Sequence, residues 1–154
     1  MRIYVACPWG LRDRAEDFAQ LLTDVGEHDI ARYWWEHEDT HDFEELSTQA
    51  QLDLEAVADS DLVVVLNYKV NVPSEGKAVE MGAAIILGIP VIAVMFGNES
   101  PNIFYKHPGV LMVETLSDAC VAISAVERFG GEDETIQLVH GRHPDDHTDE
   151  YLGI

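Results

Sequence analysis

Glu80 is the residue of this sequence whose type and position are most suggestive of chemistry. It lies in the segment 74–84, SEGKAVEMGAA, between the apolar runs 62–66 and 90–96. This pattern predicts a strand, a glycine-containing loop, a helix and a second strand. Glu80 then falls in the first or second turn of the helix, where free backbone N–H groups and the helix dipole favour negative charge. An ionised carboxylate at the open end of a parallel sheet is a candidate nucleophile.

Other residues with ligand-binding groups each also have a purely structural interpretation. Ser74 and Gly76 favour turns, and Ser74 can cap the helix, but a cap with free N–H groups can equally take a phosphate or a hydroxyl. Trp9 either packs in the core or stacks on a planar ring. Taken alone, Asp53 is one acid among many and Asn102 is an ordinary loop residue.

Cofactor signatures do not occur around Glu80. The spacing matches neither a P-loop nor the GxGxxG dinucleotide fingerprint. His140, His143 and His147 fit no established metal-binding spacing, and no cysteine lies near them. We therefore expect no metal and no other cofactor.

Length and composition indicate one globular domain. The chain has 154 residues, of which 47% are hydrophobic, with no apolar run of 18 residues and only two cysteines. The amino-terminal residues lack the apolar region and cleavage site of a signal peptide. A cytoplasmic protein with no membrane partner is the expectation.

The net charge of −20 is the outlier of the composition. It argues against nucleic-acid binding, because a phosphate backbone would be repelled. Acidic residues concentrate at 36–45 and in the tail 131–154. Charge runs of this kind usually form solvated surface, so we divide the chain into a folded domain, 1–130, and an acidic tail, 131–154.

Strands alternate with helices along the domain. We expect strands at 2–6, 29–35, 61–67, 91–96 and 110–113, helices at 12–25, 42–58 and 116–128, and a further helix that bears Glu80 and stops at Gly88. The strands are apolar throughout, which is typical of a parallel sheet covered on both faces. The sequence therefore predicts an α/β, flavodoxin-like three-layer sandwich with a five-stranded parallel sheet in the order 2-1-3-4-5.

This strand order places a topological switch point between the first and third strands. Ligands bind to such sheets at the carboxyl ends of the strands, beside the switch point. The loops that meet there are 7–10, which contains Cys7 and Trp9, and 67–74. Glu80 follows the second loop directly, so the strand order and the carboxylate predict the same cleft.

Taken together, these pieces resemble the nucleoside 2-deoxyribosyltransferase family over residues 3–113. Four elements carry the resemblance: IYVACPW at 3–9, LDL at 52–54 before ADSD at 58–61, SxGxxxEMG at 74–82, and PNI at 101–103. The third element is the most specific. The others are weak singly but occur in the order and spacing of the family.

The resemblance implies a mechanism and a set of site residues. Glu80 would attack the anomeric carbon of a 2-deoxyribosyl group, the base would leave, and a second base or water would take the sugar from the glycosyl-enzyme ester. Asp53 looks like the acid that contacts the sugar or helps the leaving base. Trp9 resembles the aromatic residue that stacks on the base, and Asn102 a polar residue that orients the nucleophile or sugar. Cys7, Ser74 and Gly76 would complete the substrate contacts.

The sequence departs from the transferase pattern at Ser74, where transferases usually carry Asp. The related deoxynucleoside 5′-monophosphate N-glycosidases have Ser-x-Gly-x-x-x-Glu at this point, and a neutral hydroxyl would admit a phosphate that a carboxylate repels. Hydrolysis of deoxynucleotides is therefore an alternative to base exchange. Two further alternatives are a non-catalytic nucleotide-binding module and an NAD glycohydrolase.

The resemblance also implies assembly. Members of the family usually form dimers or higher oligomers whose site is completed by a neighbour. We therefore expect a homo-oligomer that acts on a small nucleoside or nucleotide.

Overall fold

Five parallel strands form one sheet in the order β2-β1-β3-β4-β5. The structure is a computed structural model and describes residues 1–68, 75–98 and 102–129. The strands are β1 (Arg2–Ala6), β2 (Asp29–Ile30), β3 (Leu62–Leu66), β4 (Val91–Val94) and β5 (Val110–Val113). The register pairs Ile3 with Leu62 and Val63 with Val91. The strand order predicted from the sequence is confirmed.

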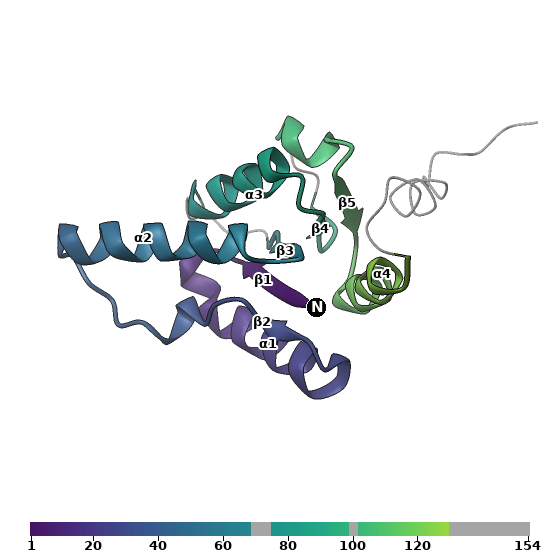
Figure 1. Cartoon of the computed structure of the whole chain (residues 1–154), viewed down its shortest axis with the longest axis horizontal. Coiled ribbons are helices and arrows are strands. Elements are labelled where there is room, and N and C mark those ends of the chain that lie inside the picture. The colour runs from purple at the N-terminus through teal and green to yellow at the C-terminus, as the bar shows by residue number, and fades with distance from the viewer. Residues whose placement is uncertain (69–74, 99–101, 130–154) are drawn as a thin grey trace, which may run out of the picture.

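Two layers of helices cover the sheet (Figure 1). One face carries α1 (Arg12–Gly26) and α4 (Leu116–Phe129), and the other carries α2 (Phe43–Ala58) and α3 (Glu75–Leu87). Every residue of β3 and β4 is buried as a result. This two-sided burial explains why these strands read as continuous apolar runs rather than as alternating patterns.

The second strand is shorter than the sequence predicts. Only Asp29–Ile30 pairs with β1, and the chain then turns into a 3₁₀ helix, Trp34–Glu36. Trp34 and Trp35 are buried there. On the same edge of β1, the carbonyl of Ile3 accepts from the Ala31 N–H, but the carbonyl of Val5 accepts from the Trp34 indole at 2.7 Å. A side chain thus replaces the next backbone bond of the ladder, which lets the strand end early.

Helix α2 contributes little to the core. Its buried residues are Ala56 and Val57, near its carboxyl end. Leu46 and Leu54, which the helical spacing places on an apolar face, are 48% and 40% exposed. The amino-terminal half of α2 extends beyond the sheet (Figure 1). Among the described residues, no helix is long and apolar enough to cross a bilayer.

Candidate active site

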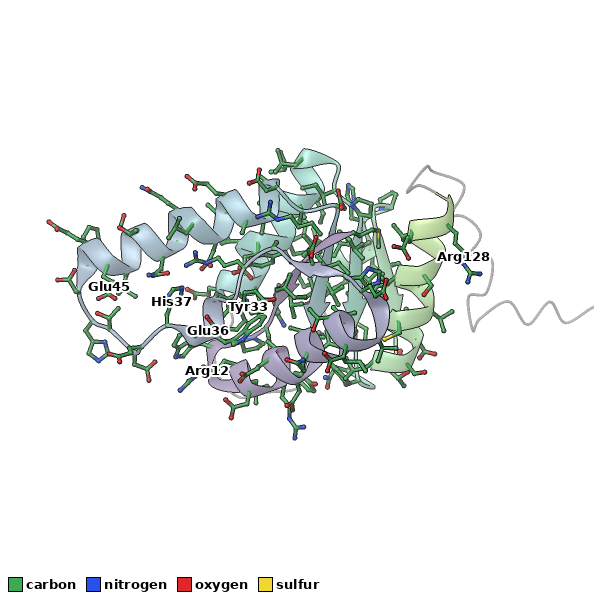
Figure 2. The ribbon with its side chains drawn as sticks, turned by 60° about the horizontal axis from the view of Figure 1, so that its bottom comes forward. Arg12, Tyr33, Glu36, His37, Glu45 and Arg128 are labelled. Carbon is green, nitrogen blue, oxygen red and sulfur yellow. The ribbon has the colours of Figure 1, made fainter. Side chains whose placement is uncertain are left out.

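A cleft of about 780 Å³ lies at the carboxyl end of β1, beside the first turns of α3, the helix that follows β3 in the chain. It is lined by residues 7–9 after β1, Arg12 of α1, Trp34, residues 37–41, one face of α2, and the first two turns of α3. The α2 residues are Leu46, Gln49, Ala50 and Asp53, which are spaced three or four apart and therefore share one face of the helix. Figure 2 shows His37 and Arg12 on the same side of the molecule, beside the loop that leads to α2. The cleft is where the topological switch point predicts it.

Glu80 lies in this cleft with its carboxylate bound to a tyrosine. The hydroxyl of Tyr4, a fully buried residue of β1, donates to Glu80 Oε1 at 2.8 Å. The pKa of Glu80 is raised from 4.5 to about 7 as the net result of four causes: burial, the largest, raises it, the Tyr4 hydrogen bond lowers it, Asp53 raises it, and Lys77 lowers it. The carboxylate is therefore poorly solvated when ionised, and it gains its charge near neutral pH. A desolvated carboxylate of this kind is a reactive nucleophile or a proton acceptor.

Sequence reasoning did not find Tyr4 as a site residue. In a strand buried on both faces, apolar alternation does not reveal which side chains face the ligand. One usable signal was the hydroxyl itself, because a buried tyrosine O–H usually finds a hydrogen-bond partner.

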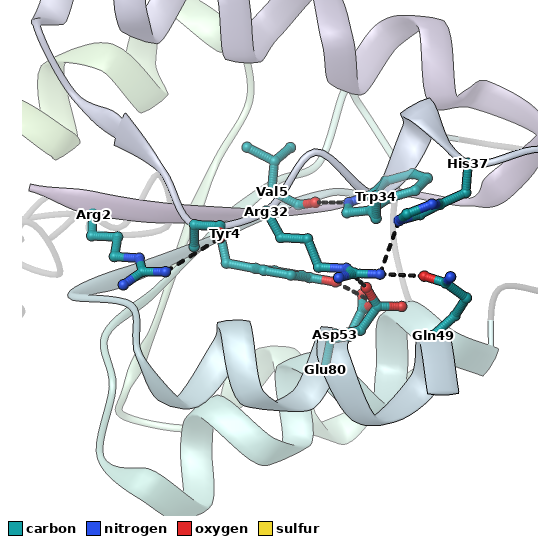
Figure 3. Close-up of polar contacts among 10 residues, drawn as sticks. Arg2, Tyr4, Val5, Arg32, Trp34, His37, Gln49, Asp53 and Glu80 are labelled. Carbon is teal, nitrogen blue, oxygen red and sulfur yellow. Dashed lines mark hydrogen bonds and ion pairs between the residues drawn. The ribbon is translucent and has the colours of Figure 1, made fainter. Parts of the chain in front are cut away.

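Asp53 is held by an arginine that the sequence analysis also missed. Arg32 Nε donates to Asp53 Oδ1 at 2.6 Å, and both side chains are mostly buried. A terminal nitrogen of the same guanidinium contacts Gln49 Oε1 and lies 2.9 Å from His37 Nε2 (Figure 3). Burial raises the pKa of Asp53, while the charge and hydrogen bond of Arg32 lower it. Because arginine keeps its proton in proteins, its charge and its hydrogen bond favour the ionised form of Asp53 and oppose the effect of burial.

Cys7 and Lys77 lie close to the nucleophile candidate. Burial raises the pKa of the Cys7 thiol to about 12, and its Sγ donates to the Leu11 carbonyl at 3.6 Å. Cys7 is thus a neutral thiol rather than a second nucleophile. Lys77 is buried, its Nζ donates to Asn67 Oδ1 at 2.7 Å, and burial lowers its pKa.

Trp9 is part of the cleft wall and ties two of its segments together. Its side chain is 40% exposed, and its indole N–H donates to Asp39 Oδ1 at 2.6 Å. The guanidinium of Arg12 lies 5.1 Å from the centre of the Trp9 ring, and the ring centroid of Trp34 lies 5.9 Å away. The bond to Asp39 fixes the segment 37–41 beside the cleft.

The remaining candidates from the sequence divide into three groups. Gly76 lines the cleft, and a Cβ added there would meet no atom within 4 Å. Asn102 does not line it; its side chain caps the 3₁₀ helix Ile103–Lys106 by accepting from the Phe104 N–H. Ser74 and the tail 131–154 lie outside the described residues. Within the described ranges, no group of three or more His, Cys, Asp or Glu residues could hold a metal ion.

Comparison with known proteins gives one family and two informative structures. The family model described as "Nucleoside 2-deoxyribosyltransferase" matches residues 3–130. A 2-deoxyribosyltransferase from Bacillus psychrosaccharolyticus is similar at 26% identity over 77% of this chain and 90% of that chain, with a TM-score of 0.60. The CMP N-glycosidase of Clostridium botulinum shares the fold at 18% identity over 80% and 99% of the two chains, with a TM-score of 0.54. No curated protein matches the chain.

Proposed function

The chain belongs to the nucleoside 2-deoxyribosyltransferase family and has a glycosyl-transfer or N-glycosidase role; we propose that it cleaves the N-glycosidic bond of 2′-deoxynucleosides with Glu80 as the nucleophile. The observation that carries the proposal is the carboxylate of Glu80, which lies in the cleft at 2.8 Å from the Tyr4 hydroxyl.

In the proposed first step, Glu80 attacks the anomeric carbon of the sugar. The bond between this carbon and the base nitrogen breaks, and its electron pair leaves with the base, which takes up a proton from solvent. The product on the protein is an ester between Glu80 and the deoxyribosyl group. In the second step, the nitrogen of another base or a water oxygen attacks the same carbon and loses its proton to solvent, and the bond to Glu80 breaks with its electron pair returning to the carboxylate.

The charges around Glu80 support such a reaction. An oxocarbenium-like transition state carries positive charge on the sugar, which an adjacent carboxylate stabilises. Asp53 supplies a second carboxyl group, and the charge and hydrogen bond of Arg32 favour its ionised form. We therefore assign Asp53 to a contact with the sugar rather than to proton donation. Tyr4 orients Glu80, since its hydroxyl donates to one carboxylate oxygen.

Aromatic and apolar side chains of the cleft lining suit the base. They belong to Trp9, Trp34, Leu46 and Ala50. Flat apolar walls of this kind favour a planar ring. We propose that the base lies against this wall while the sugar lies over Glu80, with Cys7 and Gly76 beside the sugar.

The charge of the lining favours a neutral nucleoside over its 5′-monophosphate. Acidic residues of the described lining are Glu38, Asp39, Asp53, Glu75 and Glu80, against the basic Arg12 and Lys77. An excess of carboxylates repels a phosphate dianion. The second candidate, a deoxynucleoside 5′-monophosphate N-glycosidase, is supported by the position of Arg12 and Lys77 in the cleft and by Ser74 in the sequence.

Chromatographic release of free base tests the proposal. The four 2′-deoxynucleosides and their 5′-monophosphates are incubated with the wild type, Glu80→Ala and Glu80→Gln, with and without an acceptor base. We expect both variants to lose roughly 10³-fold or more of the rate, as for loss of a covalent nucleophile. Base exchange in the presence of an acceptor indicates a transferase, and release of base without one indicates a hydrolase. Full activity of Glu80→Ala would exclude the mechanism.

A further inference from the structure

The contact between Arg32 and His37 fixes the position of the ring proton on His37. A guanidinium nitrogen of Arg32 lies 2.9 Å from His37 Nε2. Arginine can only donate, so Nε2 must offer its lone pair and a neutral ring must carry its hydrogen on Nδ1. The structure therefore assigns His37 the Nδ1–H tautomer.

The Nδ1–H group of His37 is open to a ligand. Within the described part of the chain, Nδ1 of His37 makes no hydrogen bond. It is also not a buried atom, because the buried side-chain nitrogen that lacks a partner there is His28 Nδ1. Nδ1 is therefore not sealed inside the protein. The residue lines the cleft together with Trp9 and Trp34, so a hydrogen-bond donor stands beside the wall that suits a base.

Arg32 also connects His37 to the carboxylates of the cleft. The guanidinium that contacts His37 binds Asp53, and the charge of Asp53 in turn acts on Glu80. Figure 3 shows the guanidinium of Arg32 between the His37 ring and the Asp53 carboxylate. Glu80 and His37 line the same cleft, so a nucleoside with its sugar over Glu80 has His37 within the same binding site as its base.

We propose that His37 is a specificity-determining residue whose Nδ1–H donates a hydrogen bond to the nucleobase, and that Arg32 is the positioning residue that holds it in this tautomer. The inference rests on the proposed function. The acceptors that every base offers near the glycosidic bond are the O2 of pyrimidines and the N3 of purines. As the glycosidic bond breaks, the departing electron pair makes these atoms more negative. The hydrogen bond therefore strengthens in the transition state and acts on kcat.

Two substitutions of His37 separate this role from a structural one. In His37→Asn the amide N–H₂ occupies the position of Nδ1 and can still donate to a base, but the contact with Arg32 is lost. In His37→Gln the amide oxygen reaches the position of Nε2 and can still accept from Arg32, but no donor remains at the Nδ1 position. A structural role predicts that the Gln variant is the more active, and a base-binding role predicts the Asn variant.

The experiment measures kcat and KM of both variants with the best of the four 2′-deoxynucleosides. We expect His37→Gln to lose roughly 10- to 100-fold in kcat, the scale of one hydrogen bond at a site of developing charge, and His37→Asn to keep at least five times the activity of His37→Gln. Equal activities, or a more active Gln variant, would overturn the inference.

A second measurement keeps this inference separate from the proposed function. Binding of the free bases adenine and cytosine, measured by calorimetry, needs no turnover. If the wild type releases no base from any substrate, the proposed function fails. In that case the role of His37 is tested by base binding alone. Weaker binding to His37→Gln than to the wild type and to His37→Asn supports the role, and any other result refutes it. If Glu80→Ala abolishes base release but both His37 variants match the wild type, only the role of His37 is refuted.

Discussion

Replacing Tyr4 by Phe should move the pH dependence of the reaction rather than abolish it. The hydroxyl donates to the carboxylate of Glu80 at 2.8 Å and lowers its pKa. A hydrogen bond to a charged group contributes roughly 1.5–3 kcal/mol, and one pKa unit corresponds to about 1.4 kcal/mol. The variant should therefore raise the pKa of Glu80 by roughly one to two units above its value of about 7.

The sign of the effect follows from the need for an ionised nucleophile. At pH 7 the wild type has about half of its Glu80 ionised, given a pKa of about 7. A pKa of roughly 8 to 9 leaves about a tenth to a hundredth ionised, so kcat/KM at pH 7 should fall roughly 5- to 50-fold. Near pH 9.5 most of the loss should be recovered.

The assay is the rate of base release from pH 5 to pH 10, with Tyr105→Phe as the control. Tyr105 is also a buried tyrosine, and burial raises its pKa to about 12, but it does not line the cleft. Its substitution should leave the inflection of the profile in place. A fall in activity of Tyr4→Phe that is equal at every pH, with the inflection unmoved, would refute the reasoning.

Three further outcomes are expected. The pKa of Glu80 is raised from 4.5 to about 7, mainly by burial, so its contribution to stability is fully present below pH 4.5 and is lost as the pH rises through 7. Glu80→Gln is neutral at every pH, so calorimetry should show a melting temperature several degrees above that of the wild type at pH 8 and a much smaller increase at pH 4.5. Truncation after Gly130 should leave melting temperature and base release unchanged, and a clear loss of either would show that the tail is part of the site. Sedimentation should give a dimer or larger assembly, because Val79 and Ile86 of α3 are 57% and 86% exposed and apolar patches often mark interfaces; a monomer at all concentrations would contradict this.

The sheet and the location of the cleft could be predicted because parallel strands buried on both faces leave a strong signal. Long apolar runs gave β1, β3, β4 and β5, and the alternation with helices gave their order. That order alone brings the Trp9 loop and the helix of Glu80 to one place. Asp53 lines the same cleft because α2 runs along it.

The polar contacts in the cleft could not be predicted, because they depend on side-chain directions. Arg32 follows β2, which ends at Ile30, five residues before its predicted end, and beyond that point the Trp34 indole replaces a backbone donor. The sequence also favoured a negative Glu80 on the basis of the helix dipole, but burial acts more strongly. The dipole contributes about 0.3–1 kcal/mol, whereas the rise of the pKa from 4.5 to about 7 corresponds to roughly 3 kcal/mol.

The shortness of β2 also bears on aggregation. An unpaired strand margin is a template to which a strand of another chain can add. Here the outermost strand offers two residues, Asp29–Ile30. Further along, Trp34 lies across the segment of β1 that would otherwise be open, because its indole occupies the Val5 carbonyl. A strand of another chain therefore finds little unpaired backbone to bind at this edge of the sheet.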